Sequence, residues 1–214
     1  MRFAEAVARL ASLPEELPAP PDVLMPVRLD TGERRRPAIT SGPPDAIAAS
    51  VLVLITPAHD AAEAAAELIL IERAHHGHHP GEISFPGGRA ELGESAEETA
   101  LREAAEEVGL DAAAAQVRVI GHLETFWIPV SGYRVQPVLA IANRWPVLQP
   151  SPDEVAAIIR APLAAFVPPA RIRIVESTVR DWWLRYGAYP VGDHLVWGAT
   201  ARILGQLGAL LGQA

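Results

Sequence analysis

Two apolar runs rich in Val, Ile and Leu stand out in the first half of the chain. They cover residues 46–55 and 67–72, and a turn-like segment that begins at Pro57 separates them. A second pair of the same texture covers residues 117–123 and 134–142. Short apolar runs bounded by turn residues are typical of buried strands. We therefore expect two pairs of neighbouring strands.

Between and around these strands the apolar residues recur at helical spacing. Gly109 ends the strongest helical pattern, which is rich in Ala, Glu, Leu and Arg. Pro162 is expected to kink or end another helix. The aromatic segment 172–186 predicts a further strand pair or hairpin. The predicted helices cover residues 3–13, 95–108, 152–166 and 199–211.

Strands interrupted by single helices, without a regular alternation of strand and helix, predict a mixed sheet covered by helices, an α/β fold. The chain has 214 residues, which suits one domain with an extension. Residues 14–44 are rich in Pro and Gly and read as an irregular lead-in. We expect residues 45–214 to form the domain and residues 1–44 to pack on it.

Charge and composition exclude several classes of function. The 26 acidic and 18 basic residues give a net charge of −8, which repels a long polyanion, so we expect no nucleic-acid polymer as partner. Uninterrupted apolar stretches fall short of the roughly 20 residues that cross a bilayer, so no membrane span is expected. The absence of cysteine excludes disulfides and thiolate metal sites and favours a cytoplasmic location.

Three carboxylates on the predicted helix 95–108 carry the chemistry. Glu103, Glu106 and Glu107 stand at i, i+3 and i+4, so their side chains share one helical face. Like charges at this spacing repel one another unless a hard cation lies among them, and Mg²⁺ prefers such oxygen ligands. The neighbouring pair Gly87 and Gly88 lets the backbone approach a ligand closely. An exposed helix supported by Glu–Arg pairs is the alternative on spacing alone.

A wider pattern resembles the Nudix box. Gly88, Glu94 and the run 102–110, Arg-Glu-Ala-Ala-Glu-Glu-Val-Gly-Leu, fill every fixed position of the box at its offset. Ala104 replaces the larger aliphatic residue that is more usual, which concerns packing. The resemblance implies a Nudix fold, with a mixed sheet sandwiched between helices. It also implies a hydrolase that cleaves a nucleoside diphosphate linked to another group by attack of water on phosphorus, with Mg²⁺ or Mn²⁺.

The resemblance further implies roles for individual residues. The ligands of the metal ion would be Glu103, Glu106, Glu107 and the carbonyl of Gly88. Arg102 and Glu94 would be the pair that holds the loop against the helix, and Glu103 could be ligand and base together. Glu154 matches the place of an additional acidic ligand or base in many relatives. As an acid in the first turn of the expected helix 152–166, Glu154 could equally be there for the helix dipole alone.

Segments outside the box resemble the coenzyme A pyrophosphatase branch of Nudix proteins. These segments are residues 79–88, 131–138 and 194–204. The implied reaction is hydrolysis of coenzyme A (CoA) or acyl-CoA to 3′,5′-ADP and 4′-phosphopantetheine or its acylated form. The expected contacts to this substrate are Arg73, His79, Gly87, Gly88 and Phe126.

One position departs from that branch. Gly77 stands where the branch has an arginine, and the segment 75–79 contains four histidines instead. Arg73 or the histidines could supply the missing phosphate contact, and a zinc site in this segment is a weaker alternative. The departure keeps open a Nudix enzyme for another substrate, such as ADP-ribose or a dinucleoside polyphosphate. A Nudix-fold domain that binds a ligand without turnover is the alternative of a different class, and a homodimer is also left open.

Overall fold

A mixed β-sheet forms the centre of the computed structural model, which describes residues 1–33, 42–60, 63–75, 81–129, 131–179 and 181–213. Its main path is β4-β3-β2-β8-β6, with β5, β9 and β7 paired to β2, β3 and β8 respectively. β2 runs parallel to β8, whereas the other pairs are antiparallel. The strands are β2 (Ile47–Pro57), β3 (Ala66–Arg73), β4 (Ile83–Ser84), β5 (Gly87–Arg89), β6 (Val117–His122), β7 (Phe126–Ile128), β8 (Tyr133–Ala142) and β9 (Val155–Pro162).

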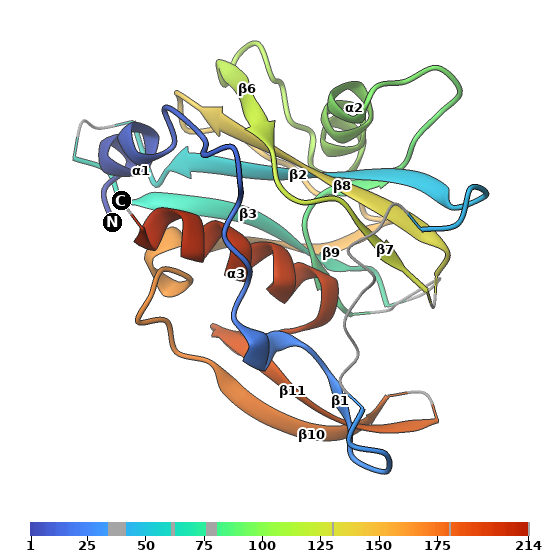
Figure 1. Cartoon of the computed structure of the whole chain (residues 1–214). Coiled ribbons are helices and arrows are strands. Elements are labelled where there is room, and N and C mark those ends of the chain that lie inside the picture. The colour runs from blue at the N-terminus through green and yellow to red at the C-terminus, as the bar shows by residue number, and fades with distance from the viewer. Residues whose placement is uncertain (34–41, 61–62, 76–80, 130, 180, 214) are drawn as a thin grey trace.

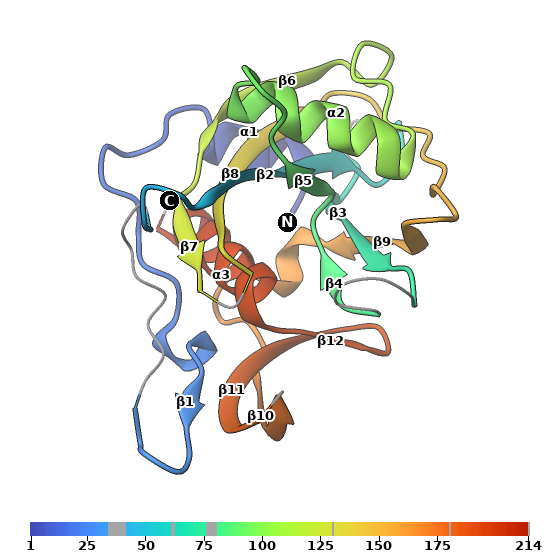
Figure 2. The ribbon, with the colours of Figure 1, turned by 90° about the vertical axis from the view of Figure 1, so that its right-hand side faces the viewer.

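Helices cover both faces of this sheet (Figures 1 and 2). Helix α2 (Ala96–Val108) packs on one face, where Leu52 and Leu54 of β2 join its buried core. Helix α3 (Gly198–Gly212) packs on the other face with Val53 and Ile55, the intervening residues of β2. Both faces of the strand are buried, which explains its nearly continuous apolar sequence. The three layers confirm the predicted α/β fold.

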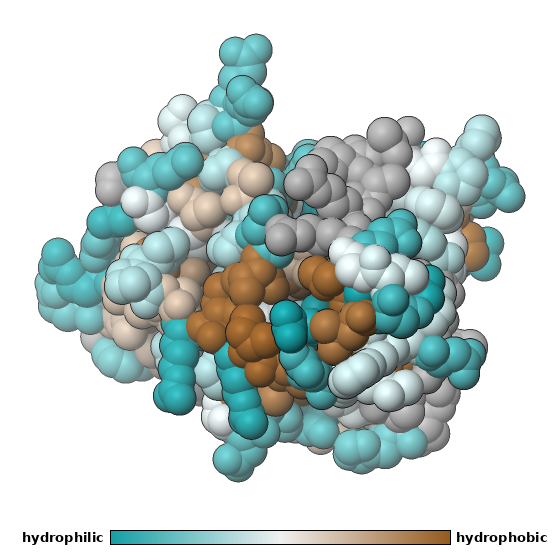
Figure 3. All heavy atoms as spheres, turned by 60° about the horizontal axis from the view of Figure 1, so that its bottom comes forward, coloured by the Kyte–Doolittle hydropathy of each residue, from teal (hydrophilic) through white to brown (hydrophobic). Residues whose placement is uncertain are grey.

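A smaller sheet lies beyond α3, on the side away from α2 (Figure 1). It contains β1 (Val27–Arg28), β10 (Arg173–Val179), β11 (Trp182–Val191) and β12 (His194–Val196). The predicted hairpin is confirmed, although β11 extends beyond residue 186. Ile174 and Trp183 of this sheet are about half exposed. The molecule seen from this side has hydrophobic side chains gathered among hydrophilic ones (Figure 3).

The helix predicted over residues 152–166 is wrong. This segment forms strand β9, which runs antiparallel to β3, followed by a 3₁₀ turn over Leu163–Ala165. Ile158 of β9 is opposite Ile71 of β3 and packs against the core beneath α2. This long-range packing outweighs the helical propensity of the alanines. Pro162 is the last residue of the strand.

The N-terminal segment contributes to the core under α3. Helix α1 (Phe3–Arg9) is shorter than predicted and ends at the cap residue Leu10, four residues before Pro14. A 3₁₀ turn follows at Asp22–Leu24, and Leu10 and Leu24 pack with residues of α3. In the described part of the chain, no helix combines the length and apolar character that a bilayer crossing requires.

Candidate active site

Local signals fix the two ends of helix α2. The Ser95 hydroxyl accepts a hydrogen bond from the backbone N–H of Glu98, and the Glu98 carboxylate accepts one from the N–H of Ser95. This reciprocal pair is a capping box. At the other end Gly109 adopts the left-handed conformation, with φ of 64°, that ends many helices. The acidic side chains between these ends are therefore held on a rigid element.

The glycine pair of β5 brings the chain close to both β2 and α2. A Cβ atom on Gly87 would lie 2.3 Å from the carbonyl oxygen of Ser50, and φ of Gly87 is 152°, so only glycine fits here. The N–H of Gly87 donates a hydrogen bond of 2.8 Å to the carboxylate of Glu107. This bond ties the β5 turn to the last turn of the helix.

Glu107 is the most deeply buried acid of the site, with 4% of its surface exposed. Its pKa is raised to about 7, chiefly by burial and also by the negative charges of Glu103 and Glu154. The Gly87 N–H and the positive charge of Arg73 act in the opposite direction. Glu107 is therefore under the influence of charges from three elements: α2, the end of β3 and the residue before β9.

Glu103 lies against the second glycine. A Cβ atom on Gly88 would be 2.5 Å from its carboxylate, so a side chain at position 88 would force the carboxylate to move. Desolvation by burial raises the pKa of Glu103, and the neighbouring Arg102 opposes this shift. Glu103 therefore lies between the glycine turn and the helix, in space that a residue larger than glycine at position 88 would occupy.

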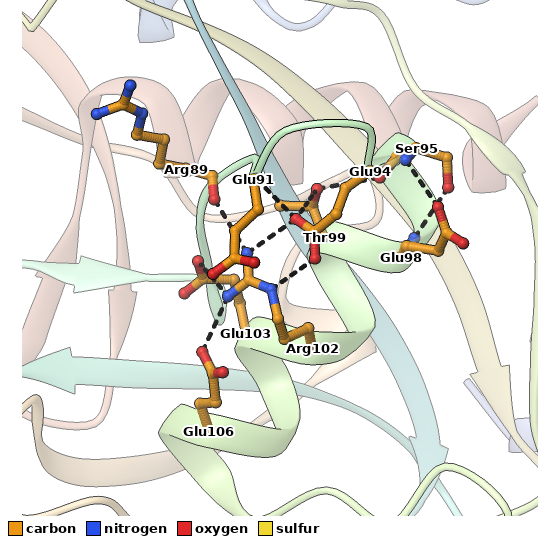
Figure 4. A network of polar contacts seen from close by, with 9 residues as sticks. All are labelled: Arg89, Glu91, Glu94, Ser95, Glu98, Thr99, Arg102, Glu103 and Glu106. Carbon is orange, nitrogen blue, oxygen red and sulfur yellow. Dashed lines mark hydrogen bonds and ion pairs between the residues drawn. The ribbon is translucent and has the colours of Figure 1, made fainter.

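Arg102 is the centre of a polar network (Figure 4). Its Nε and Nη2 donate hydrogen bonds of 2.7 and 3.0 Å to the two oxygens of Glu94. Nη1 donates to Glu103 at 3.0 Å and to Glu106 at 2.9 Å. Nη2 also reaches the carbonyl of Arg89, at 3.0 Å. The predicted Arg102–Glu94 contact is present, and the same guanidinium bonds to two of the three carboxylates expected to bind the metal.

The donor set fits a hard divalent cation, with one rearrangement. Among the described residues, no three His, Asp or Glu side chains are gathered as a ready metal site, because Arg102 bridges Glu103 and Glu106. Buried carboxylates beside a backbone turn are the oxygen ligands that such a cation prefers. The space over Gly88, which a Cβ atom would fill, is what admits the Glu103 carboxylate. To bind a cation there, Nη1 of Arg102 must release Glu103 and Glu106 while the guanidinium keeps Glu94.

The remaining predicted residues have different positions. Glu154 is not in a helix: it immediately precedes β9, where its carbonyl accepts a hydrogen bond from the N–H of Ala74. Its charge nevertheless reaches Glu103 and Glu107. Phe126 is 2% exposed and packs in the core under α3, so its ring is not open for the expected contact to substrate.

The histidine segment is described only in part. Gly77 and His79 lie outside the described residues, so the expected phosphate contacts of this segment stay predictions. His75 is described: its side chain is 73% exposed and its Nε2 lies 3.6 Å from the Glu72 carboxylate.

Two hollows adjoin the loop between β5 and α2. One, of about 500 Å³, is lined by Arg89, Ala90, Glu91, Leu92, Arg102 and Glu103. The other, of about 430 Å³, lies against the sheet and is lined by Ala48, Ala49, Ser50, Ala90, Glu94, Ala96, Thr125, Arg134 and Gln136. Sequence reasoning missed Thr125, Arg134 and Gln136 as a group. The signal was the two-residue alternation of strand β8, which places Arg134 and Gln136 on one face; Thr125 immediately precedes β7.

Comparisons with known proteins identify the family of the chain. Residues 46–187 match the family model of the NUDIX domain. The chain is 36% identical over 152 residues to NudL of Escherichia coli K12, described as an uncharacterized Nudix hydrolase. The aligned residues cover 68% of this chain and 75% of NudL. The chain is 34% identical over 137 residues to Nudix hydrolase 15, mitochondrial, of Arabidopsis thaliana, covering 59% and 46%. Among solved structures, the Nudix hydrolase RenU of M. smegmatis is similar with a TM-score of 0.47 and 23% identity, covering 66% of this chain and 80% of RenU.

Proposed function

Because the chain belongs to the Nudix family of pyrophosphohydrolases, we propose that its substrate is CoA or an acyl-CoA. Hydrolysis of the diphosphate would release 3′,5′-ADP and 4′-phosphopantetheine or its acylated form. One observation supports hydrolysis at this place above all: the buried Glu107 and the half-buried Glu103 lie against the glycine turn, and the charge of Glu154 acts on both. The resemblance of the segments 79–88, 131–138 and 194–204 to the coenzyme A pyrophosphatase branch supports the choice of substrate.

Nudix hydrolases generally use divalent metal ions, and we propose Mg²⁺, for which Mn²⁺ could substitute. The carboxylates of Glu103, Glu106 and Glu107 and the carbonyl of Gly88 would hold it. When bound, it would neutralise charge on the diphosphate and lower the pKa of the attacking water. The oxygen of this water would form a bond to one phosphorus while the bond from that phosphorus to the bridging oxygen breaks. The leaving phosphate keeps the electron pair.

The protein's own residues would position this reaction and accept a proton. The Gly87 N–H orients the Glu107 carboxylate. Arg102 anchors the loop through Glu94. Glu103 and Glu154 are the candidates for the base that accepts the proton of the attacking water. The negative charges of both act on Glu107 in the site. The positive charge of Arg73 acts on Glu107, and we assign Arg73 to the phosphates of the substrate.

The test is a panel of diphosphates incubated with the protein and Mg²⁺. Formation of 3′,5′-ADP from CoA supports the proposal. Turnover of ADP-ribose or a dinucleoside polyphosphate without turnover of CoA contradicts the choice of substrate but keeps the chemistry. Tight binding of a diphosphate without any product would support a binding domain in place of an enzyme.

A second substrate class has one specific observation in its favour. The position occupied by an arginine in the CoA branch is Gly77 here, so that phosphate contact is lost. An enzyme for ADP-ribose or a dinucleoside polyphosphate would not need this contact.

The cytoplasmic location favoured by the sequence and the homodimer that it leaves open stay predictions.

A further inference from the structure

The hollow against the sheet has a floor of small side chains and one cation. Ala48, Ala90 and Ala96 leave room above the sheet, and the volume of about 430 Å³ is within the usual range of small-molecule sites. Ala90 also lines the hollow that contains Glu103. The two hollows therefore adjoin across a single residue of the loop that follows β5.

Arg134 is placed at this hollow by the strand register. On β8 it lies opposite Ala48 of β2 on one side and Trp127 of β7 on the other. No hydrogen bond, ion pair or ring contact engages its guanidinium within the described part of the chain. Arg134 is thus a cation with its hydrogen-bonding groups available, at the rim of an apolar floor.

Three other polar side chains of the hollow, Glu94, Thr125 and Gln136, are already engaged. Glu94 is the acid that lines it, and both oxygens of Glu94 are bonded to Arg102. The Thr125 hydroxyl donates to the amide oxygen of Gln136, whose amide nitrogen donates to the carbonyl of Leu123 at 2.9 Å. The charge of Arg134 is therefore left without a local counterpart.

An apolar surface beside a guanidinium that has no ion-pair partner among the described residues suits a nucleobase attached to an anionic group such as phosphate. Arginine binds phosphate with two parallel hydrogen bonds, which gives both strength and orientation. We propose that this hollow binds the nucleoside half of the substrate, with Arg134 on a phosphate that is not cleaved. This inference rests on the proposed function, in which that group is the 3′-phosphate of CoA.

The experiment compares CoA with dephospho-CoA, which lacks only the 3′-phosphate, in the wild type and in Arg134→Gln. The wild type is expected to have the lower KM for CoA. Arg134→Gln should raise KM for CoA by about 10- to 100-fold, the range of one charged hydrogen-bonding contact, and leave KM for dephospho-CoA and both kcat values nearly unchanged. Arg173→Gln is the matched control, because it removes the same charge from an exposed position of the smaller sheet. It should change neither KM.

A second variant tests the shape of the hollow without changing its charge. Ala48 is exposed on β2, so Ala48→Leu should be accepted by the fold and should raise KM for CoA and dephospho-CoA alike. Equal effects of Arg134→Gln on the two substrates, or no effect of Ala48→Leu on either, would overturn the inference.

A direct binding measurement separates this inference from the proposed function. If neither CoA compound is hydrolysed, the choice of substrate fails, but calorimetric binding of 3′,5′-ADP still tests the hollow. Weaker binding by Arg134→Gln than by Arg173→Gln would support the site. Equal binding by the two variants, or no binding by the wild type, would refute it.

Discussion

The backbone N–H of Gly87 and the carboxylate of Glu107 are 2.8 Å apart and form the hydrogen bond that joins the β5 turn to helix α2. The N–H fixes one carboxylate oxygen, and burial removes most of the water from the other. A carboxylate in this state is costly without a cation nearby. The contact therefore gives the proposed site a rigidly held carboxylate whose burial favours a nearby positive charge, and Arg73 supplies part of that charge.

Glu107→Gln should lower kcat for the preferred diphosphate by at least about 10²-fold, the scale for loss of one group that stabilises charge in a transition state. The amide oxygen can still accept from Gly87, so the fold should remain. Glu97→Gln is the matched control, since Glu97 is on the same helix with its side chain 50% exposed. A rate near the wild type in Glu107→Gln would remove this residue from the site.

Gly87→Ala should destabilise the protein by about 3 kcal/mol or more, because its Cβ atom would collide with the backbone of β2. Gly192→Ala is the control: φ of Gly192 is 55° and no atom lies within 4 Å of its added Cβ. That variant should lose only about 1–2 kcal/mol, the cost of the left-handed conformation. Urea unfolding of both variants measures the difference, and equal losses would show that Gly87 is not sterically required.

Much of the site could be predicted because its signals are local. Ser95 and Gly109 mark the ends of α2 in the sequence, and the spacing of Glu103, Glu106 and Glu107 follows from helical geometry. The contact between Arg102 and Glu94 follows from the box pattern. The additional bonds of Arg102 to Glu103 and Glu106 depend on side-chain conformations, which spacing does not fix.

Features that depend on distant segments were not predictable in the same way. The alanines of β9 favour a helix locally, but pairing with β3 places the segment in the sheet and Glu154 beside α2. Strand β7 is too short to give a periodic pattern. Phe126 is expected to contact the substrate, but Arg202 covers its ring: the guanidinium carbon lies 4.9 Å from the ring centre.

Glu94→Gln should lower the stability of the protein at neutral pH but not at low pH. Hydrogen bonds from Arg102 lower the pKa of Glu94 from its ordinary 4.5 to about 2. A lowered acid pKa contributes stability that is present above the unfolded pKa and is lost as the pH falls through the folded one. The melting temperature of the variant should be a few degrees below the wild type near neutral pH. This difference in melting temperature should disappear between about pH 4.5 and pH 2. A difference that stays constant over that range would contradict the assignment.

Arg202→Met should cost about 3 kcal/mol of unfolding free energy. Arg202 is buried in α3, with its side chain 7% exposed, and pairs with Glu124 at 2.9 Å. Removing one partner leaves a partly buried carboxylate unpaired. Arg185→Met breaks an exposed pair with Glu176, at side-chain exposures of 55% and 42%, and should cost less than about 1 kcal/mol. If chemical denaturation shows the same loss in both variants, the α3 contact is no more than a surface pair.

A titration with Mn²⁺, followed by electron paramagnetic resonance of the free ion, tests the central claim most directly. The wild type should bind Mn²⁺ saturably as Arg102 releases Glu103 and Glu106. A triple variant with glutamine at positions 103, 106 and 107 should bind none in the same concentration range. Equal binding by both proteins, or none by the wild type, would contradict the proposed metal site.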